Sequence, residues 1–248
     1  MKDLLTPLSA QMPPSVPLPS ASGSDRLVRL ESKFPLVGAE LAIRLLEIHW
    51  RPDSAFPSNQ VFTIHFDTPS LDAYAENRSG DFVKTKVRVR WYADGEQWTG
   101  PARVRLEAKR KFGLRVEKSF LLMEVPSIPQ QDCLDNAFWA PLISQALPAL
   151  APDLRGPLMP VLLSRYHRRR FVDPWGSARA SLDTGLTGLA VSPWAAPART
   201  GPLQIPGTVL EIKRQAEPLP DWIRLIPSLR EQSFSKYAVL LGRYLNDQ

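Results

Sequence analysis

The chain contains 248 residues, of which 44% are hydrophobic and 23% charged, so it can bury a sizeable core and has the composition of a soluble globular protein. A formal net charge of +6 favours an anionic partner, provided that the charge is clustered. Cys133 is the only cysteine, and no stretch approaches the roughly 18 to 20 apolar residues of a membrane helix, which excludes an internal disulfide, a cysteine-rich metal site and a spanning segment.

The first 24 residues contain five prolines among serine and alanine and show little apolar periodicity. The sequence therefore predicts a flexible Pro/Ser-rich tail over residues 1–24, followed by one folded domain over residues 25–248. The tail lacks the continuous apolar core that a secretory signal requires. We expect a cytoplasmic protein, in which any association with a membrane goes through a partner.

The first part of the domain shows strand and helix patterns in turn. Residues 27–34 alternate polar and apolar side chains as a strand does, and residues 36–50 carry leucines at the spacing of an amphipathic helix that ends before Pro52. Residues 60–67, rich in Val, Phe and Ile, predict a second strand. A Thr-Pro-Ser turn and a polar connection through Gly80 are expected to follow.

Two basic strands come next, joined by a hairpin with an Asp94-Gly95 turn. In an extended strand, side chains at every second position share one face, so the first segment has a cationic row opposite an apolar row of valines and Trp91. The cationic row consists of Lys84, Lys86, Arg88 and Arg90, and the second segment repeats the phase with Arg103, Arg105, Glu107, Lys109 and Lys111. Like charges on paired strands are unfavourable unless counter-charge or a polyanion covers them.

The rest of the chain predicts short strands with few helices. A strand is expected at residues 114–123, and one or two short helices, interrupted by Pro141 and Pro148, at residues 132–150. Later elements are short strands at 160–166, 178–183 and 208–213, a proline-rich loop at 191–206, and a helix at 234–245 that Ser233 or Ser235 caps. This pattern indicates an α+β fold built on an antiparallel barrel or a highly curved sheet with helical covers.

Single lysines and arginines are usually solvated, so the simplest interpretation of the basic rows is a wet strand face above an apolar core. Against this, several further strands show the same arrangement, with sparse glutamates of the kind that a cation site among phosphate-binding lysines requires. The three histidines have no carboxylates spaced as metal ligands, so we interpret them as structural or surface residues. The sequence lacks a glycine-rich phosphate loop and a nucleophile elbow, and its seven tryptophans are too dispersed for a base-stacking platform.

Several short motifs follow one another in a fixed order from about Arg26 to the C-terminus. They are Glu31-Ser32-Lys33-Phe34; Phe66-Asp67-Thr68 with Tyr74 and Gly80; Lys86 to Tyr92; Leu106-Glu107-Ala108-Lys109 with Lys118; Tyr166-His167-Arg168; Arg179 with Asp183; Leu210-Glu211-Ile212-Lys213; and Phe234-Ser235-Lys236-Tyr237. In this order they resemble the VTC domain, the polyphosphate polymerase branch of the triphosphate tunnel metalloenzymes, also called the CYTH-like superfamily.

The resemblance implies a tunnel of eight antiparallel strands with a polar, basic interior and flanking helices outside. Matched position by position, the residues implied to bind and activate phosphate are Lys33, Arg88, Arg90, Lys109, Lys118, Arg168, Arg179, Lys213 and Lys236. Lys86 is implied as a further substrate-binding cation, and Tyr166 and Ser235 as hydroxyls that hydrogen-bond phosphate oxygens. Glu211 is implied as the principal ligand of Mn²⁺ or Mg²⁺, with Glu107 and Glu31 assisting.

The function that the resemblance implies is a phosphotransferase that binds a nucleoside triphosphate and transfers its terminal phosphoryl group to polyphosphate. A triphosphatase or tripolyphosphatase, and a non-catalytic sensor of polyphosphate or inositol polyphosphate, remain alternatives. Arg29-Leu30-Glu31-Ser32-Lys33 stands where the hydrolase branch has Glu-x-Glu-x-Lys, which weakens a two-metal hydrolase. A membrane-protein partner is compatible with the tail, and no nucleic acid is expected, because a tunnel suits a slender phosphate chain better than a duplex.

Overall fold

One antiparallel sheet of nine strands organises the computed structural model, which describes residues 30–95, 102–113, 115–125, 133–154, 156–190, 202–215, 218–227 and 229–246. The predicted tail at residues 1–24 lies outside these ranges, as does most of the predicted loop at residues 191–206. The strands are β1 (Leu30–Leu36), β2 (Arg51–Pro52), β3 (Ser58–Asp67), β4 (Val83–Ala93), β5 (Ala102–Phe112), β6 (Arg115–Val125), β7 (Met159–Val172), β8 (Arg179–Ala190) and β9 (Leu203–Arg214).

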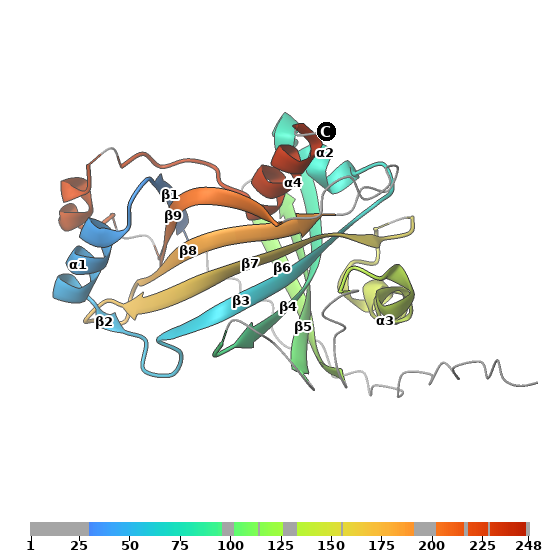
Figure 1. Ribbon diagram of the computed structural model, residues 1–248, viewed down its shortest axis with the longest axis horizontal. Helices are drawn as coiled ribbons and strands as arrows, with labels where there is room; N and C mark the ends of the chain where they lie inside the picture. The colour runs from blue at the N-terminus through green and yellow to red at the C-terminus, as the bar shows by residue number, and fades with distance from the viewer. Residues whose placement is uncertain are drawn as a thin grey trace, which may run out of the picture.

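Eight of these strands form a continuous path in the order β1-β9-β8-β7-β3-β4-β5-β6, and the two-residue β2 pairs with β7. The path is strongly curved and twisted, so that β4, β5 and β6 lie across from β7, β8 and β9 (Figure 1). No hydrogen-bonded pairing joins β1 to β6 among the described strands, so the sheet curves like a tunnel wall without closing. The predicted antiparallel α+β architecture with flanking helices is confirmed.

The alternation of side chains divides this sheet into two chemically different faces. On the outer face, Val87, Val89 and Trp91 of β4 join Leu106 of β5 and Leu121 of β6 in one apolar cluster. The inner face of the same strands carries the charged residues of the alternating rows. The main cores therefore lie between the outer face and the helices, which leaves the inner face free for polar groups.

In the described ranges, five helical segments cover the sheet: α1 (Glu40–His49), α2 (Asp72–Ser79), α3 (Asn136–Leu150), the short 3₁₀ helix η1 (Asp221–Leu225) and α4 (Lys236–Asn246). Helix α3 buries Trp139 and Ile143 against the outer face of β4, β5 and β6. Helix α1 and η1 cover β1, β8 and β9, while α2 and α4 lie together over another part of the sheet (Figure 1). No helix in the described ranges is both long and apolar enough to cross a membrane.

Helix α2 replaces the polar connection that was predicted after the second strand. Its sequence has no apolar stripe, and only Tyr74 is buried, so periodicity gave no signal. The helix begins on the buried Asp67 carboxylate, which accepts hydrogen bonds from the backbone N–H groups of Ala73 at 2.9 Å and Tyr74 at 3.0 Å. A side chain from the preceding strand therefore satisfies donors that a helix leaves open at its start.

The region predicted as one or two interrupted helices forms the single helix α3, with Pro141 and Pro148 inside it. Each proline removes a backbone donor, a cost that the burial of the apolar face of α3 offsets. Strands β7 and β8 also extend beyond their predicted bounds, and β9 starts at Leu203, inside the predicted loop. Pairing with a neighbouring strand extends each of them past the short apolar run visible in the sequence.

Candidate functional site

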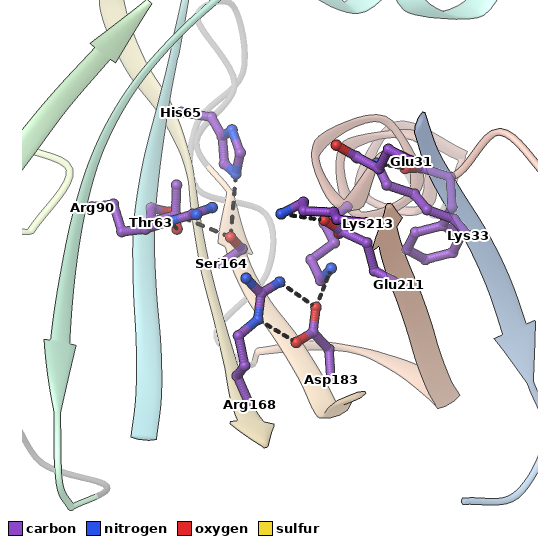
Figure 2. A network of polar contacts seen from close by, with 12 residues as sticks. Glu31, Lys33, Thr63, His65, Arg90, Ser164, Arg168, Asp183, Glu211 and Lys213 are labelled. Carbon is purple, nitrogen blue, oxygen red and sulfur yellow. Dashed lines mark hydrogen bonds and ion pairs between the residues drawn. The ribbon is translucent and has the colours of Figure 1, made fainter. Parts of the chain in front are cut away.

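Charged side chains from β1, β4, β7, β8 and β9 point toward a shared space on the inner face (Figure 2). Ion pairs add Glu107 of β5 and Lys236 of α4 to this group. Most of the candidate residues follow from strand alternation, since they alternate with residues of the outer cores, whereas Ser235 and Lys236 come from the start of α4 and Tyr166 is itself part of a core cluster. This inner set comprises Glu31, Lys33, Lys86, Arg88, Arg90, Glu107, Lys109, Lys118, Tyr166, Arg168, Arg179, Glu211, Lys213, Ser235 and Lys236. Cations outnumber carboxylates in this set, so the inner face carries a positive charge excess.

The most buried part of the site is an ion-pair network on β7 and β8. Arg168 donates from Nε to Asp183 Oδ1 at 2.6 Å and from a terminal nitrogen to Oδ2 at 2.7 Å (Figure 2). Lys236, the first residue of α4, lies 2.6 Å from the same Oδ2 atom. Burial acts to raise the pKa of Asp183, but Lys236 and Arg168 outweigh it and lower that pKa below its usual value.

Tyr166 lies beside this network with its ring almost completely buried. The Lys236 ammonium nitrogen is 4.7 Å from the ring centroid and the Arg168 guanidinium carbon is 5.3 Å from it. Burial raises the pKa of the Tyr166 phenol, but Arg168 and Arg90 bring that pKa below its ordinary value. Two cations and an aromatic hydroxyl are thus held within one small region.

A second group of charges lies on the paired strands β1 and β9. Lys33 Nζ is 2.9 Å from Glu31 Oε1, and Lys213 Nζ is 2.6 Å from Glu211 Oε1. The strand register places Glu31 opposite Lys213 and Lys33 opposite Glu211, so the two carboxylates are diagonal neighbours. Burial raises the pKa of Glu211, but Lys213 and Arg168 hold it well below the usual range, so its carboxylate is ionised.

Strands β4, β5 and β6 place three lysines side by side, because Lys86 pairs with Lys109 and Lys109 pairs with Lys118. We call Lys86, Lys109 and Lys118 the lysine row. Burial, together with neighbouring cations, lowers the pKa of Lys86 to about 7 and that of Lys109 to about 8, although Glu31 opposes the shift at Lys109. Keeping the lysines of this row protonated therefore costs free energy, and a bound anion would remove that cost.

Glu107 separates the lysine row from the next arginines. Its Oε2 atom accepts from Arg88 Nε at 2.6 Å, and its Oε1 atom lies 3.0 Å from Arg105 Nε. Arg90, two residues beyond Arg88, donates to the Thr63 hydroxyl at 3.1 Å. Both Glu107 oxygens thus pair with guanidinium groups, and these contacts orient Arg88 and Arg105 along the inner face.

The segment before α4 contacts both β1 and β4. Lys33 Nζ donates to the Phe234 carbonyl at 3.2 Å, and Lys86 Nζ donates to Ser235 Oγ at 3.2 Å. Ser235 Oγ also accepts from the Ala238 backbone N–H at 3.4 Å, as predicted for a residue that caps this helix. The start of α4 therefore brings Ser235 and Lys236 to the inner face beside strands far away in the sequence.

A divalent metal fits best between the carboxylates of β1 and β9. The described residues contain no group of three or more His, Cys, Asp or Glu side chains placed to hold a metal. Mg²⁺ and similar ions, however, are often held by one or two carboxylates, with substrate phosphates and water completing the coordination. Glu31 and Glu211 match this donor set, whereas the Glu107 oxygens are taken by Arg88 and Arg105.

Two of the candidate residues lie at the margins of the site. Arg179 is exposed at the start of β8, where the Asp53 carboxylate interacts with it electrostatically. Lys118 is exposed on β6, the end strand of the path. It interacts electrostatically with Lys213, Glu31 and Glu211. Charges near the two ends of the sheet path are therefore close enough across the inner face to affect one another.

Sequence reasoning missed Asp183 as a buried counter-ion, and it missed Thr63, His65 and Ser164. His65 Nε2 is 3.2 Å from Ser164 Oγ, and burial together with Arg88 and Arg90 lowers the pKa of His65 well below its usual value (Figure 2). His65 is thus a neutral residue of the inner face. Thr63 and His65 alternate with Phe62, Ile64 and Phe66 of the outer core, so strand phase could have indicated them.

The chain is similar to known proteins both in sequence and in structure. The VTC domain family model matches residues 44–241. A solved structure from Vibrio parahaemolyticus, described as a "putative adenylate cyclase", is similar with a TM-score of 0.46 and 11% identity, over 86% of this chain and 97% of the other.

A second such protein, from Bacillus halodurans, has a TM-score of 0.40 and 10% identity, over 89% of this chain and 88% of the other. A search of curated proteins finds no significant match. The family match covers more than half of the sequence, including most of the strands that carry the inner cations. The chain therefore belongs to the VTC domain family.

Proposed function

We propose that this protein is a polyphosphate polymerase-like phosphotransferase. It would bind a nucleoside triphosphate, a growing polyphosphate chain and a divalent metal on the inner face of the sheet. The observation that carries the proposal is the lysine row, in which Lys86, Lys109 and Lys118 are neighbours on three adjacent strands. Cations that lower one another's pKa are held together most favourably when a polyanion supplies the missing counter-charge.

The chemistry requires few groups beyond those on the inner face. A terminal phosphate oxygen of the acceptor chain attacks the terminal phosphorus of the nucleoside triphosphate, the bond to the adjacent bridging oxygen breaks, and the nucleoside diphosphate leaves. Such transfers depend on positioning and charge neutralisation more than on covalent catalysis by the protein. Arg88, Arg90 and Arg168 offer planar donors suited to phosphate oxygens, whereas lysines supply point charges.

The remaining candidate residues have roles consistent with their places. Lys33, Lys213 and Lys236 would bind phosphates from the β1, β9 and α4 side, and Arg179 would act at the margin. The hydroxyls of Tyr166 and Ser235 would hydrogen-bond phosphate oxygens. Glu31 and Glu211 would hold Mn²⁺ or Mg²⁺, which would supply further positive charge to offset the charge of the phosphates.

The test is a polymerisation assay with purified protein, ATP and Mn²⁺ or Mg²⁺, with and without a short polyphosphate primer. Polyphosphate longer than the primer, formed with one ADP per added phosphate, is the expected product. Glu211→Gln should abolish its formation, whereas Glu124→Gln, at an exposed ion pair with Arg103, should not. Free phosphate without polymer would instead identify a triphosphatase and refute the polymerase proposal.

A binding-only sensor of polyphosphate or inositol polyphosphate is the second candidate function. The observation that favours it is that Glu31 and Glu211 each already neutralise a lysine, and no third potential metal ligand joins them in the described part of the chain. This function predicts salt-sensitive binding without turnover. A membrane-protein partner, as implied by the family resemblance, would be compatible with either function.

A further inference from the structure

The inner face changes character at the end of β4, β5 and β6 that lies beyond Arg90. Tyr92 follows Arg90 in the inner phase of β4 and keeps 45% of its surface exposed. On β6, Phe120 and Leu122 continue the inner phase of Lys118, and Leu122 is 48% exposed. Aromatic and aliphatic side chains thus join the inner face within a few residues of the cations, beside the exposed ion pair of Arg103 and Glu124 in the same phase.

These side chains are neighbours across the strands. Arg90 pairs with Arg105 on β5, and Arg105 pairs with Leu122 on β6, so one lateral row joins the three strands. Arg105 also stacks on Phe120, with its guanidinium carbon 3.8 Å from the ring centroid. We call Tyr92, Arg105, Phe120 and Leu122 the aromatic rim.

The flat groups of the aromatic rim are held in place before any ligand binds. The Glu107 carboxylate fixes Arg105 from one side while Phe120 supports its face. Tyr92 is supported by Arg170, whose guanidinium carbon is 5.5 Å from the Tyr92 ring centroid. Arg170 is itself hydrogen-bonded to the Asn59 side chain and the Phe56 carbonyl. Side chains ordered in this way lose little conformational entropy when a ligand stacks on them.

The exposure of the rim is unusual for these strands. Their outer-face neighbours Trp91, Leu121 and Met123 are buried in the main core, as apolar strand residues normally are. Tyr92 and Leu122 instead lie in the inner phase, where Tyr92 is two residues from Arg90 and Leu122 pairs with Arg105, the cross-strand partner of Arg90. A ligand that matches both surfaces has a flat, partly apolar group at one end and phosphates at the other.

We propose that the aromatic rim binds the base of the nucleoside triphosphate, so that the triphosphate extends along the inner face past Arg90 and Arg88 toward the lysine row. The inference rests on the proposed function and adds the orientation of the nucleotide. Stacking on aromatic rings and guanidinium planes accepts any base, because every base has a π face. The rim therefore favours nucleotides over bare phosphate chains without selecting one base.

The test compares two ligands that share the phosphate chain. Dissociation constants of ATP and of inorganic tripolyphosphate are measured by calorimetry for the wild-type protein and for Tyr92→Ala, Leu122→Ala and Tyr92→Phe. Removal of the Tyr92 ring should weaken ATP binding by about tenfold, the size expected for one lost base–aromatic contact, and leave tripolyphosphate binding within about twofold. Leu122→Ala should change ATP binding in the same direction by less, and Tyr92→Phe should retain wild-type affinity.

Val116→Ala is the matched control, because Val116 is an exposed residue in the same phase of β6 on the other side of Lys118. It should alter neither ligand, and thermal unfolding verifies that every variant is folded. Equal weakening of ATP and tripolyphosphate by Tyr92→Ala, or unchanged ATP binding in both alanine variants, overturns the orientation inferred here while leaving the proposed function standing. Failure of the wild-type protein to bind either ligand refutes the proposed function itself.

Discussion

Arg168 and Asp183 occupy directly paired positions on β7 and β8 and form a two-point ion pair in which the Asp183 side chain has no exposed surface. Lys236 binds the same carboxylate from the start of α4. A single carboxylate therefore pairs with two inner cations, which leaves one net positive charge, and it connects α4 to the sheet. The Asp183 carboxylate thus supplies a negative charge to cations that are proposed to bind phosphate.

Replacement of Asp183 by Asn should destabilise the protein by about 3 to 5 kcal/mol, because it leaves the buried Arg168 charge without its partner. Urea denaturation measures the free energy of unfolding. Added polyphosphate should restore more stability to this variant than to wild type, since it supplies the lost negative charge. Asp153→Asn, which removes an exposed carboxylate that pairs with the partly buried Arg110, should cost less than about 1 kcal/mol. Equal losses in the two variants would contradict this assignment.

Lys109→Met should separate stability from binding. The substitution removes the central charge of the lysine row and retains its aliphatic volume, so the free energy of unfolding at neutral pH should rise by roughly 1 kcal/mol. Polyphosphate affinity should fall by about tenfold or more, the size of one lost charge-assisted contact. Parallel denaturation and binding measurements decide the matter, and a destabilised variant with unchanged affinity would show that Lys109 has a structural role.

Polyphosphate binding should take up protons near and above neutral pH. Burial and neighbouring cations lower the pKa of Lys86 to about 7 and that of Lys109 to about 8 in the free protein, and a bound polyanion raises both. Affinity should therefore fall as pH rises from about 7 to 9, by up to tenfold per unit for each lysine that must be protonated. Calorimetry in two buffers of different ionisation enthalpy measures the uptake, which Lys86→Met should reduce.

The same shifts have a defined effect on folding. Between about pH 7 and the ordinary lysine pKa near 10.5, the unfolded chain holds protons on Lys86 that the folded protein has released. The contribution of Lys86 to stability therefore increases with pH across this window and is unfavourable below it. Denaturation of wild type and Lys86→Met at pH 6 and pH 9 tests the sign, since the variant's stability advantage should be larger at pH 6.

Glu211→Gln should remove metal-dependent turnover without weakening polyphosphate binding in the absence of metal. The neutral amide is a poorer metal ligand, while the freed Lys213 charge adds to the attraction of the inner face for anions. Binding is measured with and without Mn²⁺, and turnover is followed as ADP release. A loss of metal-free affinity would show that Glu211 mainly positions Lys213.

Trp139→Ala tests the location of the core. The Trp139 indole is fully buried between α3 and the outer face and donates a hydrogen bond to the Cys133 carbonyl at 2.8 Å. Its removal should cost about 3 to 5 kcal/mol of stability, as for other large core residues. The folded fraction should bind polyphosphate with wild-type affinity, because the inner face is on the other side of the sheet. Weakened binding by a fully folded variant would argue against this separation.

The sequence alone determined which strand face would be charged. Alternate side chains must point to opposite faces of an extended strand, so the spacing of Lys84 to Arg90 and of the valines between them fixed the two faces before any pairing was known. The same spacing identified Lys109 as a residue of the charged face, whereas Glu211 and Lys213 were implied by the family resemblance. This information is local, because it depends on the geometry of one strand.

The tertiary structure decided which of these charges meet. Strand register and curvature placed Asp183 against Arg168 and Lys236, and they placed Lys86, Lys109 and Lys118 in one row. Helix α2 forms because Asp67 from β3 caps it, and α3 continues through its prolines because its apolar face is buried. Such outcomes depend on contacts between residues far apart in the chain, whose energies exceed the local preferences that a sequence pattern reveals.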